Sequence, residues 1–474
     1  MSLEVSAEVR RPVDSPSDRL ANSVPSEPII SESYASRDWM ILAAGVFTIA
    51  LIIRLFCFTG LIASDDLDYA NHARQISQGT YGLQSYTSAV RYGVFIPVAA
   101  FYSLFGVHEW TTVAAPLIAS SVAAMLLVLI AAQLGGWSVA LIAGLLAATF
   151  PVDVRYASIL VPEPFLQAIL LTAALLFVIA DKRNSGSLGI CAGISLGFAY
   201  LTKEPAVFVL AAFIAYALWS RRWRLVCAVA IGFALVLAVE TICYWLKSGD
   251  LFFRLHALAA HNSDVNDKGL REANDHLVYR LWQTYPRMML MPNIDFGLHS
   301  VFVLGLSTVA LLSRGLSKTT RLLLLWAAVP FAYLNFGTSS FSFYWALPAA
   351  PRYITVIYPP LFLLSAMLLV EWAATSSRQK FLVGVTVAIV CSVGIYCAVT
   401  TRATDYRTAQ VERLKQIVVA ARSHDDQICE FAGSDGSLWR QTLRIIAPDR
   451  IGCSGSRVVK LLPDSDSLPI SEPL

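Results

Sequence analysis

The sequence from Ile62 to Gly82, IASDDLDYANHARQISQGTYG, follows the first long apolar segment of the chain. It contains the first adjacent pair of acidic residues, Asp65 and Asp66. Ser64 is placed to cap a new helix, in which apolar residues recur every three positions on one face, namely Leu67, Ala70, Ala73 and Ile76. The pattern predicts an amphipathic helix on a membrane surface with two carboxylates at its start.

The composition indicates that the rest of the chain lies largely in a membrane. Of the 474 residues, 56% are hydrophobic and only 15% are charged, and the mean hydropathy is +0.59. A soluble domain carries about 25% charged residues, so the low charge is typical of a polytopic membrane protein. The net charge of +3 is too small to predict a nucleic-acid partner. We therefore expect an all-α transmembrane bundle.

Three regions follow from the distribution of apolar residues. Residues 1–37 are polar and rich in proline, and they are predicted to form a disordered cytoplasmic tail. Residues 38–400 are predicted to form the transmembrane domain, and residues 401–474 a small extracytoplasmic α/β appendage that begins with the amphipathic segment VERLKQIVVAAR. The apolar runs of the middle region lie near 39–62, 91–107, 111–132, 138–156, 164–181, 188–201, 205–219, 224–246, 298–313, 321–336, 353–372 and 380–399.

Basic residues between these runs predict the orientation of the bundle. Cytoplasmic connections are enriched in Lys and Arg. The short basic connections are Lys182-Arg183, Arg221-Arg222-Arg224, Arg314-Lys318-Arg321 and Arg378-Lys380. All of them become cytoplasmic together with the N-terminal tail if the short run 91–107, which contains Pro97, does not cross. We expect this run to be re-entrant or to lie on the surface in the first outer loop. About 11 crossings remain, in a bundle of about 11–13 helices with the N-terminus inside and the C-terminus outside.

The charged residues expected at the outer face fall into two groups. The acidic group is Asp65, Asp66, Asp68 and Glu163, and the basic group is Arg91, Lys203 and Arg352. A carboxylate can act as a general base, and Arg or Lys side chains bind phosphate. The two groups together fit a reaction between a hydroxyl nucleophile and an anionic lipid headgroup.

Each group also has a structural interpretation. Asp65 and Asp66 would be favoured in a first helical turn by the helix dipole, and Glu163 could be an ordinary acid at a helix N-terminus. The three cations could extend along apolar surface to the membrane interface. Glu240 lies inside an apolar run, where a paired structural role is expected. The outer-loop histidines His256, His261 and His276 are expected to be solvated.

Five segments resemble a known family, the polyprenyl-phosphate-sugar-dependent glycosyltransferases of the GT-C fold, which include protein O-mannosyltransferases and lipid A aminoarabinose transferases. SDDLDYANHARQISQG is similar to the family pattern of Asp-Asp/Glu followed by Tyr-Ala. RYGVFIPVAAFYSLFGVHEW resembles the segment that begins Lys-Pro-Pro, and YASILVPEPFLQA the second outer loop with its acid. GISLGFAYLTKEPA and PRYITVIYPP resemble the Gly-x-x-x-Gly…Thr-Lys and Arg-Tyr…Pro patterns.

The resemblance implies roles for individual residues. Asp65 stands at the position of the catalytic base with Asp66 beside it, and Glu163 stands at the second acid. The substrate-binding positions implied by the matched motifs are Arg91, Tyr69, Lys203, Arg352 and Tyr353.

The first outer loop also departs from the family pattern. Some members carry a metal-ligating Glu before the Lys of Lys-Pro-Pro, partnered by a loop His. Here that position is Val90, and the two prolines are replaced by Tyr92 and Gly93. No cofactor is therefore assigned, and a divalent metal is doubtful even though His256 and His261 lie in a suitable loop.

The resemblance implies an inverting glycosyltransferase at the outer face of the bacterial cytoplasmic membrane. It would transfer a sugar from a polyprenyl-phosphate-linked donor to a hydroxyl of an envelope glycolipid, glycan or protein. The main alternative is a membrane transporter or lipid flippase, which usually has binding groups near the bilayer midplane. A non-catalytic membrane scaffold is a third possibility.

Overall fold

A computed structural model describes residues 36–262, 279–338, 347, 349–404, 406–424, 428, 436–451, 457–459 and 471–473. Almost all of the tail predicted to be disordered lies outside these residues, as do His276 and the side chain of His261.

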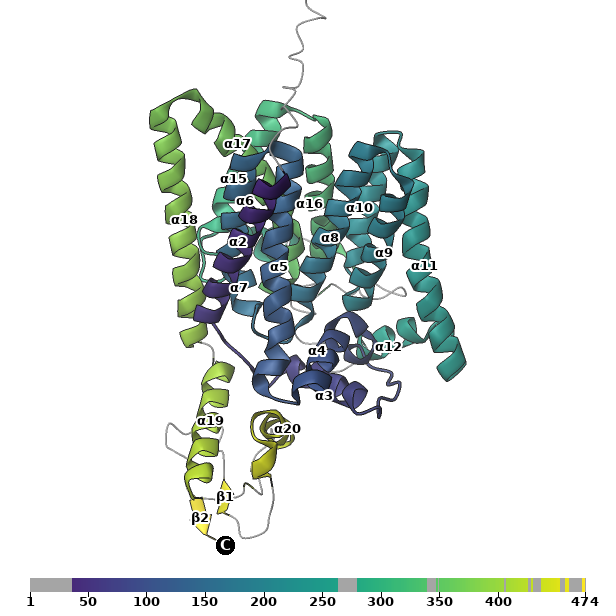
Figure 1. Cartoon of the computed structure of the whole chain (residues 1–474), viewed down its shortest axis with the longest axis vertical. Helices are drawn as coiled ribbons and strands as arrows, with labels where there is room; N and C mark the ends of the chain where they lie inside the picture. Colours follow the sequence, from purple (N-terminus) through teal and green to yellow (C-terminus); the bar gives the residue numbers. More distant parts are fainter. Residues whose placement is uncertain are drawn as a thin grey trace, which may run out of the picture.

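The described chain is almost entirely helical, and its long helices run side by side (Figure 1). Six of its helices are long and apolar enough to cross a membrane, and several shorter apolar helices pack among them. This confirms the predicted all-α polytopic membrane fold, whereas the number of crossings and the orientation stay predictions. The bundle helices are α2 (Ser36–Phe56), α5 (Glu109–Gly135), α6 (Trp137–Ala148), α8 (Pro162–Arg183), α9 (Gly186–Thr202), α10 (Ala206–Trp219), α11 (Trp223–Ser248), α15 (His299–Arg314), α16 (Lys318–Phe336), α17 (Tyr358–Thr375) and α18 (Ser377–Thr404).

One predicted run is divided in two. The run 138–156 forms α6 and then a separate short helix, α7 (Pro151–Tyr156). Proline disfavours helical backbone at the residue before it, and Phe150 is extended with ψ 118°. The break turns the chain at the end of the bundle and places α7 beside the candidate site.

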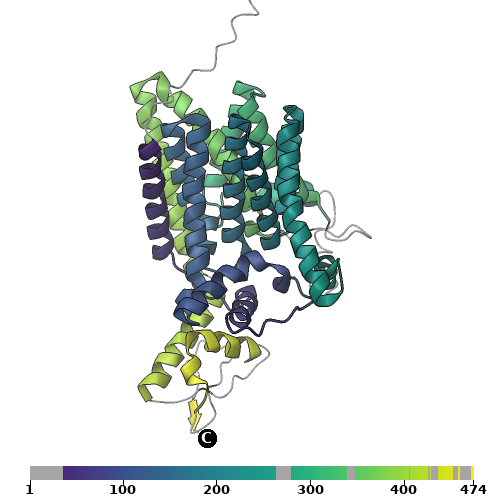
Figure 2. The same ribbon diagram turned by 45° about the vertical axis from the view of Figure 1, so that its right-hand side comes forward.

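Several short elements lie across one end of the bundle (Figures 1 and 2). They include α3 (Asp65–Ser77), α4 (Tyr92–Phe105) and α12 (Phe253–Asn262), with three short helices of other types, η1 (Ser88–Val90), η3 (Tyr279–Gln283) and η4 (Pro351–Ile357), and the short α14 (Tyr285–Leu290).

The amphipathic helix α3 forms as predicted, but its environment differs from the prediction. Leu67, Ala70 and Ala73 are buried in one apolar cluster with Val94 and Phe95 of α4. The apolar face of α3 therefore meets protein, where the sequence pattern predicted membrane lipid. The reason is that α4 supplies an apolar surface close in sequence, and packing against it removes the same area from water.

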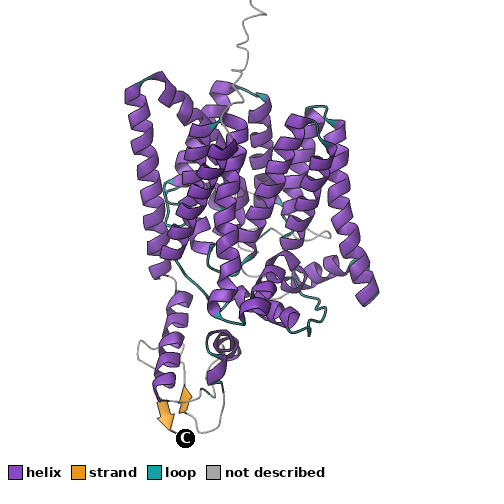
Figure 3. Ribbon diagram, viewed as in Figure 1, coloured by secondary structure: helices purple, strands orange, loops and turns teal. Residues whose placement is uncertain are grey.

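The chain after α18 contains two helices and two short strands, which Figure 3 shows below the bundle. They are α19 (Tyr406–His424), α20 (Gly436–Ile446), a 3-10 turn η5 (Pro448–Arg450), and β1 (Arg457–Val459) paired antiparallel with β2 (Ser471–Pro473). The predicted amphipathic segment is helical, and α18 continues four residues beyond the predicted boundary at 400. The division into domains stays a prediction.

Three of the predicted cytoplasmic connections meet at the opposite end of the bundle. The buried carboxylate of Asp181, near the end of α8, contacts Arg222 at 3.4 Å and Lys318 at 2.9 Å. Arg222 belongs to the connection from α10 to α11, and Lys318 begins α16. A charge cluster thus holds three helix ends together at the end far from α3.

Close packing of α9 against α11 depends on glycine. A side chain at Gly193 would collide with the backbone carbonyl of Val229, and one at Gly232 would collide with that of Ile190. Small residues allow membrane helices to approach closely. Since α9 ends directly before Lys203, this contact helps to fix the candidate site.

We expect Gly193→Ala to destabilise the bundle, because the neighbour it meets is backbone and cannot move aside. Overpacking of this kind costs about 1–3 kcal/mol. The matched control is Gly305→Ala in α15, where nothing lies within 4 Å of the added carbon. The unfolding temperature in detergent should fall only for the first variant, and equal temperatures for both would contradict this account.

Candidate active site

The loop before α3 has an unusual backbone. Gly60 has φ 83°, and Ala63 has φ 52°, which non-glycine residues rarely adopt. Asp66 holds this loop, since its carboxylate accepts hydrogen bonds from the backbone N–H groups of Ile62 at 2.8 Å and Ser64 at 2.5 Å. Ser64 is the N-cap residue as predicted, but its side chain makes no capping hydrogen bond.

Asp66 is completely buried. Burial raises the pKa of its carboxyl group to about 6, although the backbone hydrogen bonds act in the opposite direction. Both carboxylate oxygens of Asp66 accept hydrogen bonds from the backbone of its own segment.

Asp65 lies at the first position of α3 and points outward. Its side chain is 58% exposed, and its Oδ2 accepts a hydrogen bond from Arg352 at 3.1 Å. A negative charge at this position interacts favourably with the helix dipole, which agrees with the interpretation of Asp65 as a helix-stabilising residue. It also leaves most of the carboxylate accessible to another molecule.

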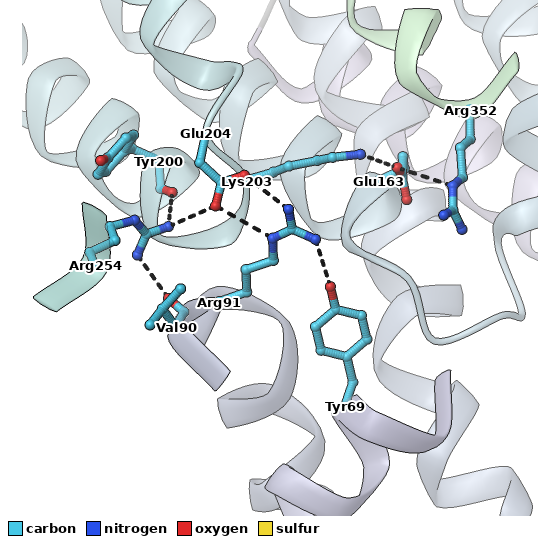
Figure 4. Close-up of polar contacts among 9 residues, drawn as sticks. All are labelled: Tyr69, Val90, Arg91, Glu163, Tyr200, Lys203, Glu204, Arg254 and Arg352. Atoms are coloured by element: carbon cyan, nitrogen blue, oxygen red, sulfur yellow. Dashed lines mark hydrogen bonds and ion pairs between the residues drawn. The ribbon is translucent and has the colours of Figure 1, made fainter. Parts of the chain in front are cut away.

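Arg352 connects Asp65 to a buried pair. Glu163, at the start of α8, lies 2.5 Å from the Nζ of Lys203 and 3.8 Å from the Nε of Arg352. The Lys203 ammonium also lies 3.7 Å from the centre of the Tyr353 ring, within the range of a cation–π interaction. These residues come from four separate parts of the chain and form one cluster, drawn in part in Figure 4.

The backbone around Lys203 is held by α4. A side chain at Gly93 would collide with Thr202, so the absence of a Cβ lets the start of α4 approach the end of α9. Gly93 stands where the resembling family has proline. The departure noted in the sequence therefore has a packing role next to the candidate cation.

A second cluster joins the first through the neighbouring residue Glu204 (Figure 4). Glu204 contacts Arg91 at 3.0 Å and Arg254 at 3.4 Å. Arg91 donates to the Tyr69 hydroxyl at 2.9 Å, and Arg254 pairs with Glu240 at 2.7 Å. The pairing confirms the structural role expected for Glu240.

The charges of this second cluster reinforce one another. Burial alone would raise the pKa of Glu204, but Arg91 and Arg254 outweigh it and lower the pKa to about 2. The carboxylate therefore stays ionised and keeps both guanidinium groups in place.

The predicted cations all have acidic partners. Each of the three is in an ion pair, namely Arg91, Lys203 and Arg352. The alternative interpretation, in which unpaired cations extend to the membrane interface, does not describe them. The structure brings together most of the predicted site residues, whereas Asp66 faces the loop backbone. Those brought together are Asp65, Glu163, Lys203, Arg352, Tyr353, Arg91 and Tyr69.

Sequence reasoning did not select Glu204, Arg254 or Asp153. Glu204 follows Lys203 directly, and its position beside a predicted site cation could have identified it as a site residue. Arg254 lies 14 positions after Glu240, too far for a sequence pattern to pair them. Asp153 lies in α7, and none of the residues in the predicted acidic and basic groups is close to it in sequence.

Asp153 lines a small cavity that opens beside Glu163, together with Tyr156, Gln167 and Thr355. Burial raises the pKa of Asp153 to about 7, while the charge of Arg54 and a hydrogen bond from Gln167 act against this. The cavity thus extends from Glu163 toward α7.

The residues around Val90 do not fit a divalent metal. Val90 is buried and apolar, and its carbonyl oxygen accepts a hydrogen bond from Arg254 at 2.8 Å. The Arg254 guanidinium thus already supplies a positive charge at this position. His256 lies in α12, where it is exposed to solvent as expected and is paired with Asp250 at 2.7 Å. Among the described residues, no group of three or more His, Cys, Asp or Glu is arranged to hold a metal.

Comparisons with known proteins identify related sequences and folds. The family described as dolichyl-phosphate-mannose-protein mannosyltransferase matches residues 94–245. This segment contains Glu163 and Lys203 but neither Asp65 nor Arg352. No curated relative matches the chain by sequence.

Solved structures of two glycosyltransferases share the fold. ArnT from Cupriavidus metallidurans has a TM-score of 0.55 in the apo state and 0.54 when bound to undecaprenyl phosphate, at 14% identity, with 90% of this chain and 93% of that chain covered. The Archaeoglobus fulgidus oligosaccharyltransferase, in the apo form, has a TM-score of 0.57 at 12% identity, with 88% and 65% covered.

The two kinds of similarity agree. The fold extends over nearly the whole chain, and the sequence match covers the part that contributes the buried Glu163–Lys203 pair. Neither supports the alternatives of a transporter or a scaffold. The chain is therefore a multi-pass membrane protein with the fold of these transferases, and its segment 94–245 is similar to the dolichyl-phosphate-mannose-protein mannosyltransferase family.

Proposed function

We propose that this protein is an inverting glycosyltransferase that uses a polyprenyl-phosphate-linked sugar. The observation that carries the proposal is the line of charges from exposed Asp65 through Arg352 to the buried pair of Glu163 and Lys203. It offers an accessible base beside cations that are held in fixed positions.

The donor is proposed from the cations. Arg352 and Lys203 present a guanidinium and an ammonium group near one another, which suits a phosphate group. Binding of undecaprenyl phosphate by a protein of the same fold, ArnT, supports a polyprenyl carrier here. A lipid-activated donor needs no nucleotide-binding loop.

The base is proposed to be Asp65. It takes the proton of an acceptor hydroxyl, whose oxygen attacks the anomeric carbon while the bond to the phosphate oxygen breaks on the opposite side. The configuration inverts, and the phosphate leaves with its negative charge. Cations that stabilise this charge remove the need for a general acid.

The remaining predicted residues receive supporting roles. Glu163 positions Lys203 and Arg352, with which it is paired. Arg91, Tyr69 and Tyr353 contribute to the substrate-binding wall, and Asp66 maintains the loop that presents Asp65.

Donor binding is proposed to activate the base. Arg352 pairs with Asp65 in the absence of substrate, and a carboxylate in an ion pair is a weaker base. A donor phosphate competes for Arg352 and leaves Asp65 free. The donor should therefore bind before the acceptor reacts.

The reaction is proposed to occur at the outer face of the bacterial cytoplasmic membrane, with the N-terminus in the cytoplasm. The acceptor would be a hydroxyl of an envelope glycolipid, glycan or protein. The basic connections clustered at the end far from α3 support this location, since such connections favour the cytoplasm.

We expect Asp65→Asn to reduce transfer by about 10²- to 10⁴-fold, the usual contribution of a general base. Binding of undecaprenyl phosphate should stay unchanged or become tighter, because Arg352 loses its internal partner. Radiolabelled sugar transfer and a lipid-dependent thermal shift measure the two effects. Near-normal transfer by the folded variant would refute the assignment.

We expect Arg352→Gln to raise the KM for the donor by at least about tenfold, since a hydrogen bond to a charged group contributes about 1.5–3 kcal/mol. The control is Arg378→Gln, an exposed arginine in the first turn of α18. An unchanged donor KM in the first variant would exclude Arg352 from donor binding.

We expect chelation of divalent metals to leave the transfer rate unchanged, because Arg254 supplies the positive charge next to Val90. The measurement is transfer by the purified protein after dialysis against EDTA, with and without added Mg²⁺ or Zn²⁺. Activity that is lost with EDTA and restored by a metal would contradict this expectation.

A further inference from the structure

The C-terminal segment shares an apolar core with the helix that carries Asp65. Leu67 of α3 and Phe95 of α4 belong to the same buried cluster as Leu414 of α19 and Leu443 of α20. Part of α3 and part of α20 also line a common groove, to which Arg74 and Arg444 both contribute. The C-terminal helices are therefore packed on the site end of the bundle, as Figure 2 shows.

A polar connection runs from the same segment to the loop before Asp65. The Lys415 ammonium lies 2.8 Å from Oε1 of Glu109, the first residue of α5. The same oxygen accepts a weak hydrogen bond from the backbone N–H of Leu61 at 3.4 Å. Gly60 approaches it so closely that an added Cβ would lie 2.6 Å away.

The loop reached by this connection needs external support. Ala63 has φ 52° in a left-handed conformation, which costs about 1–3 kcal/mol and persists only when the surroundings impose it. Its side chain is buried in the cluster shared with α19 and α20. The strained residue lies two positions before Asp65, so any relaxation of the loop moves the carboxylate.

We propose that the C-terminal segment is a positioning element of the active-site loop and that Lys415 is its main polar contact. Lys415 fixes Glu109, Glu109 fixes the backbone at Leu61, and α20 covers the apolar face of α3. The segment thereby holds Asp65 in place without contacting substrate. This inference rests on the proposed function, in which Asp65 is the base.

The test uses the full-length protein with the substitution Lys415→Met. Displacement of a catalytic group by about 1 Å can lower a rate by about 10²-fold, and we expect kcat to fall by about tenfold or more. The donor KM should stay the same, because Arg352 and Lys203 belong to η4 and to the α9–α10 connection, which the pair does not contact. Lys415→Arg should restore kcat.

A second variant separates positioning from general loss of structure. Glu109→Gln removes the same ion pair, and the double variant with Lys415→Met should be no slower than either single variant, since both act through one contact. Additive losses would overturn the proposal, and so would a rise in donor KM that matches the fall in kcat.

Control variants come from the same segment. Arg422→Met removes the exposed ion pair with Asp449 at 3.2 Å, and Glu412→Gln removes the neighbouring partner of Lys415 while leaving Glu109 in place. Both should retain the wild-type kcat. Loss of kcat in these controls equal to that in Lys415→Met would overturn the proposal.

The outcomes also distinguish this inference from the proposed function. If the wild-type protein transfers no sugar from polyprenyl-phosphate donors, the proposed function fails. If the wild type is active and Lys415→Met retains the same kcat, the positioning role fails while the proposed function stands.

Discussion

Glu163 is buried at the start of α8, and a carboxylate in such a place requires cationic partners. Lys203 and Arg352 supply them from parts of the chain about 40 and 190 residues away. The desolvation cost makes the arrangement demanding, since loss of one partner from a buried pair costs about 3–5 kcal/mol. The positions of α8, α9 and η4 are thus linked by one carboxylate, and the outward-facing Asp65 depends on the same linkage through Arg352.

The sequence allowed the membrane helices to be predicted well, because each is defined by local composition. Nearly every apolar run became helical. The run 138–156 is divided where the residue before Pro151 is extended, and the run 353–372 begins as the 3-10 helix η4 before it continues as α17. Most candidate site residues also came together, since charged residues at the ends of apolar runs are few and share one face. The sequence pattern was sufficient to predict a feature wherever neighbouring residues determine that feature.

The parts that could not be predicted depend on contacts between distant segments. The apolar face of α3 looked suited to lipid, and only the folded chain reveals that α4 and α20 cover it. Similarly, the pairing of Arg254 with Glu204 joins α12 to the connection after α9, and no spacing rule relates the two. The difference between Asp65 and Asp66 likewise follows from the loop conformation, which turns one carboxylate outward and the other toward backbone N–H groups.

Charge balance explains why Arg352 should respond to a donor. In the two clusters, the carboxylates of Asp65, Glu163, Glu204 and Glu240 match the cations Arg352, Lys203, Arg91 and Arg254 in number. An entering phosphate therefore has to take a cation from an existing pair. An exposed pair contributes only about 0–1 kcal/mol, far less than a buried one. Because the Asp65 side chain is 58% exposed while those of Glu163 and Lys203 are below 10%, the pair that yields is the one that holds the proposed base.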